Sequence, residues 1–315
     1  MKSSSFTFKD QDGIEIFVYK WAPETQFKAA VQIIHGLAEH AKRYERLAEV
    51  LCKEGYICYA NDQRGHGLTA GDLTEATLKG NAGVLGPSGW RGVVNDVHEL
   101  SMIIKKENPN LPLFLIGHSW GAFIAQDYIE EWGNEIKGCI LSGTRGKISV
   151  MVIKGGKMII KGEMKKLGPN EPSQKLHDMN FVDNNQNWQK EEGATGYEWL
   201  SRDKEEVQKY IDDPWCGFVS PANLWLEFLK GFEKIYDSEN EQKIPKNLPV
   251  FFISGALCPI GKKTKWVQAN IKRYKGYGMK DVTYKFYNDA RHELFNEINR
   301  EEVFKDVINW LDSHL

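Results

Sequence analysis

The sequence has no marked excess of one charge, no long apolar run and no paired cysteine motif. Its 315 residues include 41 basic and 43 acidic side chains, which gives a formal net charge of −2. This balance produces no overall field that would attract nucleic acid or a strongly charged partner. No apolar run approaches the roughly 20 residues that a transmembrane helix needs. The first residues do not show a signal-peptide pattern, so we expect a soluble protein.

Cysteine is scarce, and its spacing argues against two common structural roles. The five cysteines are Cys52, Cys58, Cys139, Cys216 and Cys258. An odd number of cysteines without a CxxC pair favours neither a disulfide framework nor a structural zinc site. We therefore expect a reduced, cytoplasmic protein that needs no metal and no cofactor and binds no nucleic acid. The sequence does not set its oligomeric state.

Short apolar or alternating strands alternate with amphipathic helices along most of the chain. The predicted strands lie at residues 6–9, 14–21, 29–34, 56–60, 111–116, 136–141, 248–253 and 282–287. This order is typical of the α/β class, in which helices flank a mostly parallel sheet on both faces. After residue 146 the pattern changes, and Lys, Met, Asn and Trp become frequent until about residue 220. We expect residues 1–146 and 221–315 to form one core into which 147–220 is inserted as a cap.

One motif in the core carries a specific chemistry. Gly117-His118-Ser119-Trp120-Gly121 lies between a predicted strand and a predicted helix. In that context G-x-S-x-G forms an elbow that lifts a nucleophilic serine clear of the sheet. Glycine is needed at 117 and 121 because a Cβ there would collide with neighbouring backbone. The alternative is a chance glycine-rich turn, and the strand before the motif and the helix after it argue against chance.

A serine nucleophile needs a base, and amides to hold the developing oxyanion. The Trp120 amide follows the nucleophile directly, and the loop after strand 29–34 supplies the Leu37 amide as the second candidate. Chains with this elbow run in the order serine, acid, histidine, so the base comes late. His292 follows the last predicted strand and is therefore the predicted base, whereas His35 is expected to brace its loop.

Five segments together resemble the monoacylglycerol lipase and lysophospholipase branch of the α/β-hydrolases. They are His35-Gly36-Leu37-Ala38-Glu39-His40, Arg43-Tyr44, Asn61-Asp62-Gln63-Arg64-Gly65-His66-Gly67, the elbow, and Ala290-Arg291-His292-Glu293. The resemblance implies an α/β-hydrolase fold with a cap, and hydrolysis of acyl esters through an acyl-enzyme on Ser119 with His292 as the base. It also implies that Glu39 and Arg43 lie near the polar end of the substrate pocket, although both could simply brace their loop.

The resemblance fails at one position. After the strand at 248–253, members of this branch have a motif like Ser-Gly-x-x-Asp-Pro-x-Gly, whose aspartate orients the histidine. Here the segment is Ser254-Gly255-Ala256-Leu257-Cys258-Pro259-Ile260-Gly261. A neutral thiol is a weak hydrogen-bond partner for an imidazole. Three interpretations follow: a triad impaired by Cys258, a working thiolate in the acid's place, or a protein that no longer catalyses. We favour the first because the other motifs are intact.

The inserted segment mixes lysines with large apolar side chains. Residues 147–166 predict either an amphipathic lid that contacts a membrane surface transiently or a cap helix with solvated lysines. Aromatic residues farther along the insertion are expected to line a hydrophobic pocket or to pack a cap core. Three functions stay open: a hydrolase of monoacylglycerols or lysophospholipids, a short-chain carboxylesterase or lactonase, and a non-catalytic ligand-binding pseudo-hydrolase.

Overall fold

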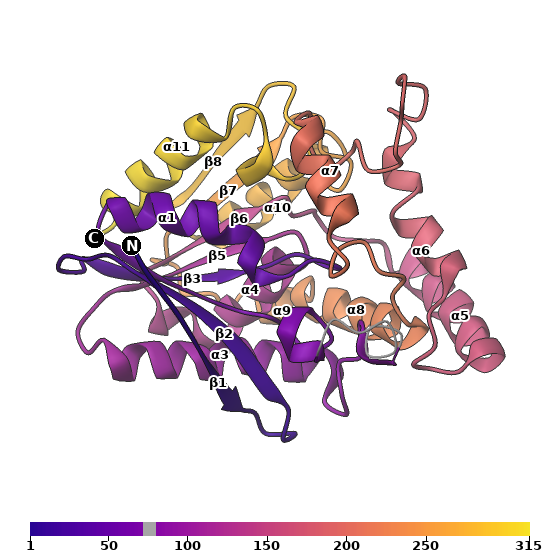
Figure 1. Ribbon diagram of the computed structural model, residues 1–315, viewed down its shortest axis with the longest axis horizontal. Helices are drawn as coiled ribbons and strands as arrows, with labels where there is room; N and C mark the ends of the chain where they lie inside the picture. The colour runs from indigo at the N-terminus through magenta and orange to yellow at the C-terminus, as the bar shows by residue number, and fades with distance from the viewer. Residues whose placement is uncertain (72–79) are drawn as a thin grey trace.

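The structure, a computed structural model, describes residues 1–71 and 80–315 and is built around one eight-stranded sheet (Figure 1). The strands are β1 (Lys2–Lys9), β2 (Glu15–Ala22), β3 (Ala29–Ile34), β4 (Tyr56–Asn61), β5 (Leu113–His118), β6 (Gly138–Ser142), β7 (Val250–Gly255) and β8 (Val282–Tyr287). Their spatial order is β1-β2-β4-β3-β5-β6-β7-β8. β2 pairs antiparallel with β1 and β4, and all other neighbours are parallel. The α/β class and the mostly parallel sheet are confirmed.

Helices cover both faces of this sheet. The helices of the described residues are α1 (Glu45–Lys53), α3 (Gly89–Glu107), α4 (Trp120–Trp132), α5 (Val150–Leu167), α6 (Gln174–Asn180), α7 (Lys204–Asp212), α8 (Ala222–Ile235), α9 (Ser238–Glu241), α10 (Lys265–Gly276) and α11 (Arg300–Asp312). α1 and α11 pack on one face, and α3, α4 and α10 on the other. Every residue of β3 to β7 is buried, as expected for parallel strands covered on both sides.

The connection between β6 and β7 is long and carries α5 to α9. α8 packs against α3, α4 and α5, so it joins this connection to the rest of the molecule. Residues of α5, α6 and α8 line the same cavity as Ser119, which lies at the carboxyl end of β5. The connection therefore covers the edge of the sheet at which the elbow lies.

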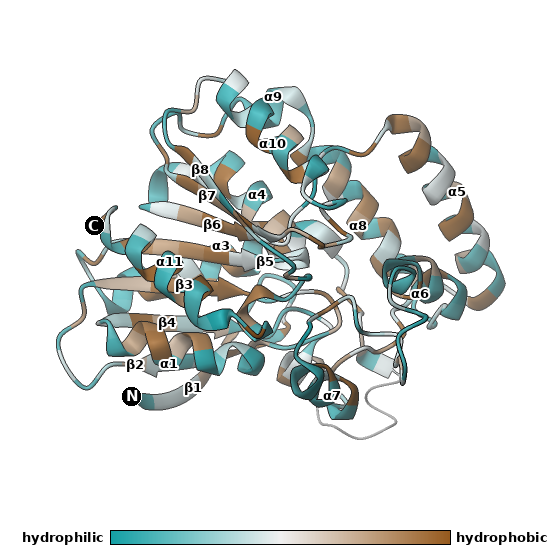
Figure 2. Cartoon of the chain, turned by 90° about the horizontal axis from the view of Figure 1, so that it is seen from above, coloured by the Kyte–Doolittle hydropathy of each residue, from teal (hydrophilic) through white to brown (hydrophobic). Residues whose placement is uncertain are grey.

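α5 exposes apolar side chains on its outer surface, along the helix that Figure 2 shows with several brown segments. The exposed apolar residues are Val150, Met151, Val152, Met158 and Leu167, whereas the partly exposed Ile159 lines the active-site cavity. Ile153 and Ile160 of the same helix are buried. Among the described residues, no helix is long and apolar enough to cross a membrane.

Candidate active site

Ser119 lies at the sharp turn between β5 and α4. Its backbone φ of 52° is in the left-handed region, which a non-glycine residue adopts only where the surrounding structure enforces it. A Cβ at Gly117 would lie 2.4 Å from the Gly121 carbonyl oxygen, and one at Gly121 would lie 2.0 Å from that of Ile34. The Ser119 amide donates to the Ser142 carbonyl on β6 at 2.9 Å. The turn therefore holds Ser119 at the start of α4, where the helix dipole adds positive potential.

Ser119 lines a cavity of about 410 Å³, a volume typical of small-molecule sites. Leu37, Trp120 and His292 line the same cavity. Much of the wall is apolar and includes Phe123, Ile148, Ile159, Ile160, Leu176, Met179, Phe181, Trp199, Leu200, Trp225, Phe228, Leu229 and Phe232. The structure thus brings the predicted nucleophile, base and oxyanion-hole residues to one cavity whose wall suits an acyl chain.

Cys258 is next to the predicted base. Its Sγ lies 3.1 Å from Nδ1 of His292, and both residues are buried. Burial raises the pKa of the Cys258 thiol to about 11, although the Gly261 and Ile260 amides favour the ionised form. Burial also holds the pKa of His292 well below its usual range. At neutral pH the pair is therefore an uncharged thiol beside an uncharged imidazole.

An uncharged thiol prepares His292 poorly for its role. The base must carry its proton on Nδ1 so that Nε2 can accept the serine proton, and a carboxylate at Nδ1 enforces this tautomer. A thiol can instead donate its proton to Nδ1, or accept only weakly from Nδ1–H. Because burial disfavours the thiolate, this geometry favours the impaired triad over the thiolate variant.

Glu293, the carboxylate adjacent to His292 in sequence, does not take the acid's place. Both terminal nitrogens of Arg43 donate to it, at 2.7 and 2.8 Å. Burial alone would raise the pKa of Glu293, but the Arg43 guanidinium lowers it to about 2. Among the described residues, no carboxylate forms a hydrogen bond with Nδ1 of His292.

Glu39 and Arg43 belong to one buried network with Glu293. Glu39 accepts hydrogen bonds from the Gly36 amide at 2.5 Å and the Tyr44 hydroxyl at 2.8 Å, and it pairs with Arg43. Glu39 and Glu293 line the cavity, and Arg43 bridges them. The network therefore forms a polar part of the wall and also braces the loop that carries Leu37.

Two contacts from the inserted segment hold the base and were not predicted. The Trp199 carbonyl accepts from the His292 amide at 3.2 Å, and the Leu200 carbonyl accepts from the Glu293 amide at 2.7 Å. The Trp199 ring also packs against the imidazole, with ring centroids 5.0 Å apart. Backbone acceptors carry no residue-type signal, so the sequence could not indicate these contacts.

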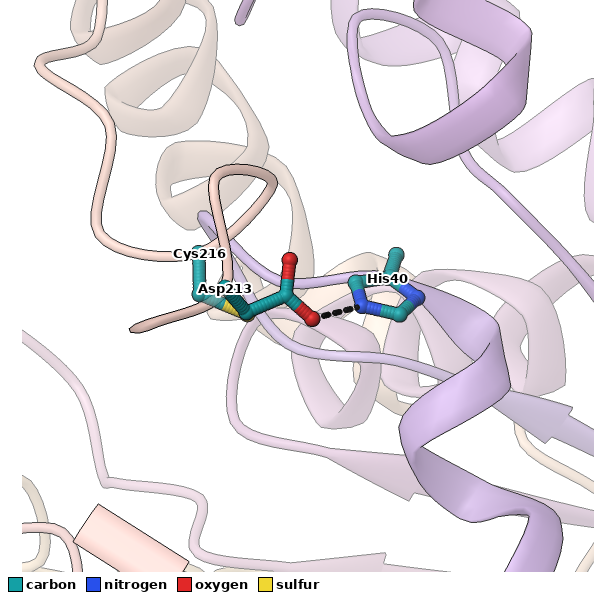
Figure 3. Close-up of side chains that lie close together, drawn as sticks. All are labelled: His40, Asp213 and Cys216. Atoms are coloured by element: carbon teal, nitrogen blue, oxygen red, sulfur yellow. Dashed lines mark hydrogen bonds and ion pairs between the residues drawn. The ribbon is translucent and has the colours of Figure 1, made fainter. Parts of the chain in front are cut away.

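A separate polar cluster joins the loop after β3 to the segment after α7 (Figure 3). His40 Nε2 lies 2.8 Å from Asp213 Oδ2, and the ligand atoms of His40, Asp213 and Cys216 all lie within 4.8 Å of one another. Such residue types can hold zinc. Here burial raises the pKa of the Cys216 thiol, and Asp213 accepts from both His40 and the Trp215 amide. The cluster is thus satisfied as a hydrogen-bonded contact without an ion.

Known proteins resemble this chain over nearly its whole length. Residues 25–299 match the family described as serine aminopeptidase, S33. The monoacylglycerol lipase of Mycolicibacterium smegmatis is 27% identical, with 99% of this chain and 98% of the relative covered. The monoglyceride lipase of Mus musculus is 27% identical, with 96% and 89% covered. A thermostable carboxyl esterase from Bacillus coagulans, solved in complex with glycerol, has a TM-score of 0.89 at 26% identity and covers 100% of this chain and 99% of its own.

Proposed function

Because the chain belongs to the serine aminopeptidase S33 family, in the monoacylglycerol lipase branch of the α/β-hydrolases, we propose that its ester-hydrolysing site cleaves monoacylglycerols or lysophospholipids. The observation that carries the proposal is the shared cavity: Ser119 on its strained elbow lies with His292 in a pocket walled by apolar side chains. Residues 147–220 act as the cap over the core of 1–146 and 221–315. The contacts from Trp199 and Leu200 to the base support this role.

The reaction follows from these positions. Ser119 Oγ attacks the ester carbonyl while His292 Nε2 takes its proton, and the Leu37 and Trp120 amides stabilise the oxyanion. His292 then gives the proton to the leaving alcohol, which leaves an acyl group on Ser119. Water activated by His292 releases the acid and regenerates the serine. Cys258 slows both halves of the cycle, because each needs the tautomer that a carboxylate would enforce.

Acyl-chain preference separates this function from that of a short-chain carboxylesterase. We expect kcat/KM for p-nitrophenyl esters to rise from acetate to octanoate, by roughly fourfold for each methylene fully buried in the apolar wall. Leu176→Trp, which fills part of the cavity, should shift the preference to shorter esters. An optimum at acetate in the unmodified chain would instead favour the carboxylesterase or lactonase.

The buried thiol predicts an unusual pH dependence. With a pKa of about 11, the thiolate fraction is small at pH 7 and rises about tenfold for each pH unit up to pH 10. We expect kcat to rise over this range as the thiolate begins to orient His292, whereas Cys258→Asp should reach its plateau near neutral pH. A plateau at neutral pH in both proteins would contradict this role for Cys258.

Stability must be followed in the same experiment. The folded thiol has a pKa above the ordinary cysteine value of 9.0, so the folded state favours its protonated form. That contribution to stability is present below pH 9 and is lost as pH rises towards 11. Circular dichroism at each pH separates a true rise in kcat from unfolding.

We propose that the outer surface of α5 contacts lipid transiently. Met151 and Met158 are 84% and 74% exposed, and lysines on the same helix can interact with anionic headgroups. The double substitution Met151→Glu and Met158→Glu should reduce co-sedimentation with phosphatidylglycerol vesicles but not hydrolysis of a dissolved ester. Met102→Glu, at an exposed position on α3, is the matched control. Equal co-sedimentation of all three proteins would overturn the proposal.

A cytoplasmic location is also proposed, and the state of the cysteines supports it. All five cysteines are free thiols. Free thiols persist in the reducing cytoplasm, whereas oxidising compartments favour disulfides.

A further inference from the structure

Arg145 is a charged side chain in the active-site cavity, and residues 1–71 and 80–315 give it no acidic partner. It follows β6 and lines the cavity together with Ser119. Its Nε is buried without a hydrogen-bond partner, and the guanidinium forms no ion pair within the described part of the chain. The guanidinium lies instead over two aromatic rings, 4.1 Å from the Trp266 centroid and 5.8 Å from that of Phe232.

This arrangement leaves the charge of Arg145 only partly compensated. Burial lowers the pKa of its guanidinium, which shows that the surroundings disfavour the cation. Aromatic faces attract a cation, but less strongly than a carboxylate does in a desolvated site. The cavity's own carboxylates, Glu39 and Glu293, are already paired with Arg43. Arg145 is therefore available to a charged group on a ligand.

The backbone around Arg145 holds it in place. Its carbonyl accepts a hydrogen bond from the Tyr236 hydroxyl. The next residue, Gly146, lies so close to the start of α10 that a Cβ there would be 2.5 Å from the Trp266 carbonyl oxygen. Lys262 Nζ lies 5.1 Å from the Trp266 ring centroid, which adds a second positive charge beside this part of the cavity. The backbone at Arg145 is thus fixed before any ligand binds.

We propose that Arg145 binds a negatively charged group of the substrate, a phosphate or a carboxylate, while Ser119 attacks the ester in the same cavity. The planar guanidinium fork matches both groups with two parallel hydrogen bonds. A phosphate belongs to a lysophospholipid headgroup, and a carboxylate to the far end of a dicarboxylic half-ester. This inference rests on the proposed ester hydrolysis and selects anionic esters among its substrates.

The test compares binding of three esters of equal acyl length to a Ser119→Ala variant, so that turnover does not interfere. The probes are octanoylglycerol, octanoylglycerol phosphate and the glycerol monoester of octanedioic acid, measured by calorimetry. We expect at least one anionic ester to bind about tenfold or more tightly than the neutral one, as a charged hydrogen-bond partner implies. Arg145→Met should bring the ratio of the anionic ester's affinity to that of the neutral ester close to one. Arg145→Lys should keep part of the difference. Lys147→Met, which removes an exposed charge two positions away, is the matched control.

The outcomes separate this inference from the function on which it rests. Tighter binding of the phosphate ester alone, relative to the neutral ester, identifies a lysophospholipid-type ligand. Tighter binding of the carboxylate ester alone identifies a dicarboxylic half-ester. Equal affinities for all three probes, or a ratio that Arg145→Met does not change, overturn the inference and leave the proposed function standing. If none of the three binds, both are overturned.

Discussion

Replacing Cys258 with aspartate is expected to raise kcat for ester hydrolysis by up to about 10⁴-fold, the loss seen when a triad acid is neutralised. The physical reason is the His292 tautomer: a carboxylate in place of the Cys258 Sγ, which lies 3.1 Å from Nδ1, would hold the proton there and stabilise the imidazolium. KM should change little, because this residue does not line the cavity and acts through the base. Steady-state hydrolysis of p-nitrophenyl octanoate measures both constants.

The position of Cys258 is prepared for a carboxylate. Burial is the largest influence on the pKa of the Cys258 thiol and raises it. The amides of Gly261 and Ile260 and the Ser254 hydroxyl act in the opposite direction, because they favour a negative charge at this position. A carboxylate that accepts such hydrogen bonds remains ionised even when buried. The introduced aspartate would therefore not be an uncompensated charge, and the variant should fold.

A matched variant separates charge from shape. Cys258→Asn introduces a side chain of nearly the same shape as aspartate but without its charge, and it should leave kcat low. If the folded Cys258→Asp protein has an unchanged or lower kcat, residue 258 is not the acid position. The cysteine would then be a buried packing residue.

Ser119→Ala should abolish turnover, and the loss is largest where the triad is complete. In the Cys258→Asp background we expect kcat to fall by about 10⁶-fold, as for removal of a serine nucleophile from a working triad. Alanine retains the Cβ and the positive φ, so the thermal midpoint should stay close to that of the parent. Ser142→Ala is the matched control, because the Ser142 hydroxyl contacts His118 and not His292. Residual turnover near the parental rate in Ser119→Ala would place the nucleophile elsewhere.

Much of the fold could be predicted because each buried parallel strand corresponds to a short apolar run in the sequence. The strand at 29–34 has the predicted bounds, whereas β5 continues two residues farther, into the elbow, where Gly117 and His118 pair with β6. α10 begins only at Lys265, because the three preceding residues adopt a positive φ, which a right-handed helix excludes. Strand pairing and loop conformation of this kind depend on tertiary neighbours, so the periodicity of the local sequence does not predict them.

The convergence of the candidate site was predictable for a related reason. The carboxyl ends of parallel strands meet at one edge of the sheet, so motifs that follow β3, β5, β7 and β8 come together there. The ion pair between Arg43 and Glu293 could not be predicted in this way, and neither could the lack of an acidic partner for Arg145 among the described residues. Arg43 and Glu293 lie far apart in sequence, and no spacing rule specifies which charges pair.

We propose that Ser119 is the nucleophile of a triad whose acid position holds a thiol. The most direct test is the rate at which a fluorophosphonate adds to the protein, followed by intact mass spectrometry with peptide mapping. We expect a slow single adduct on Ser119, a much faster one in Cys258→Asp, and none in Ser119→Ala. An adduct on another residue, or equal rates with cysteine and aspartate at position 258, would contradict it.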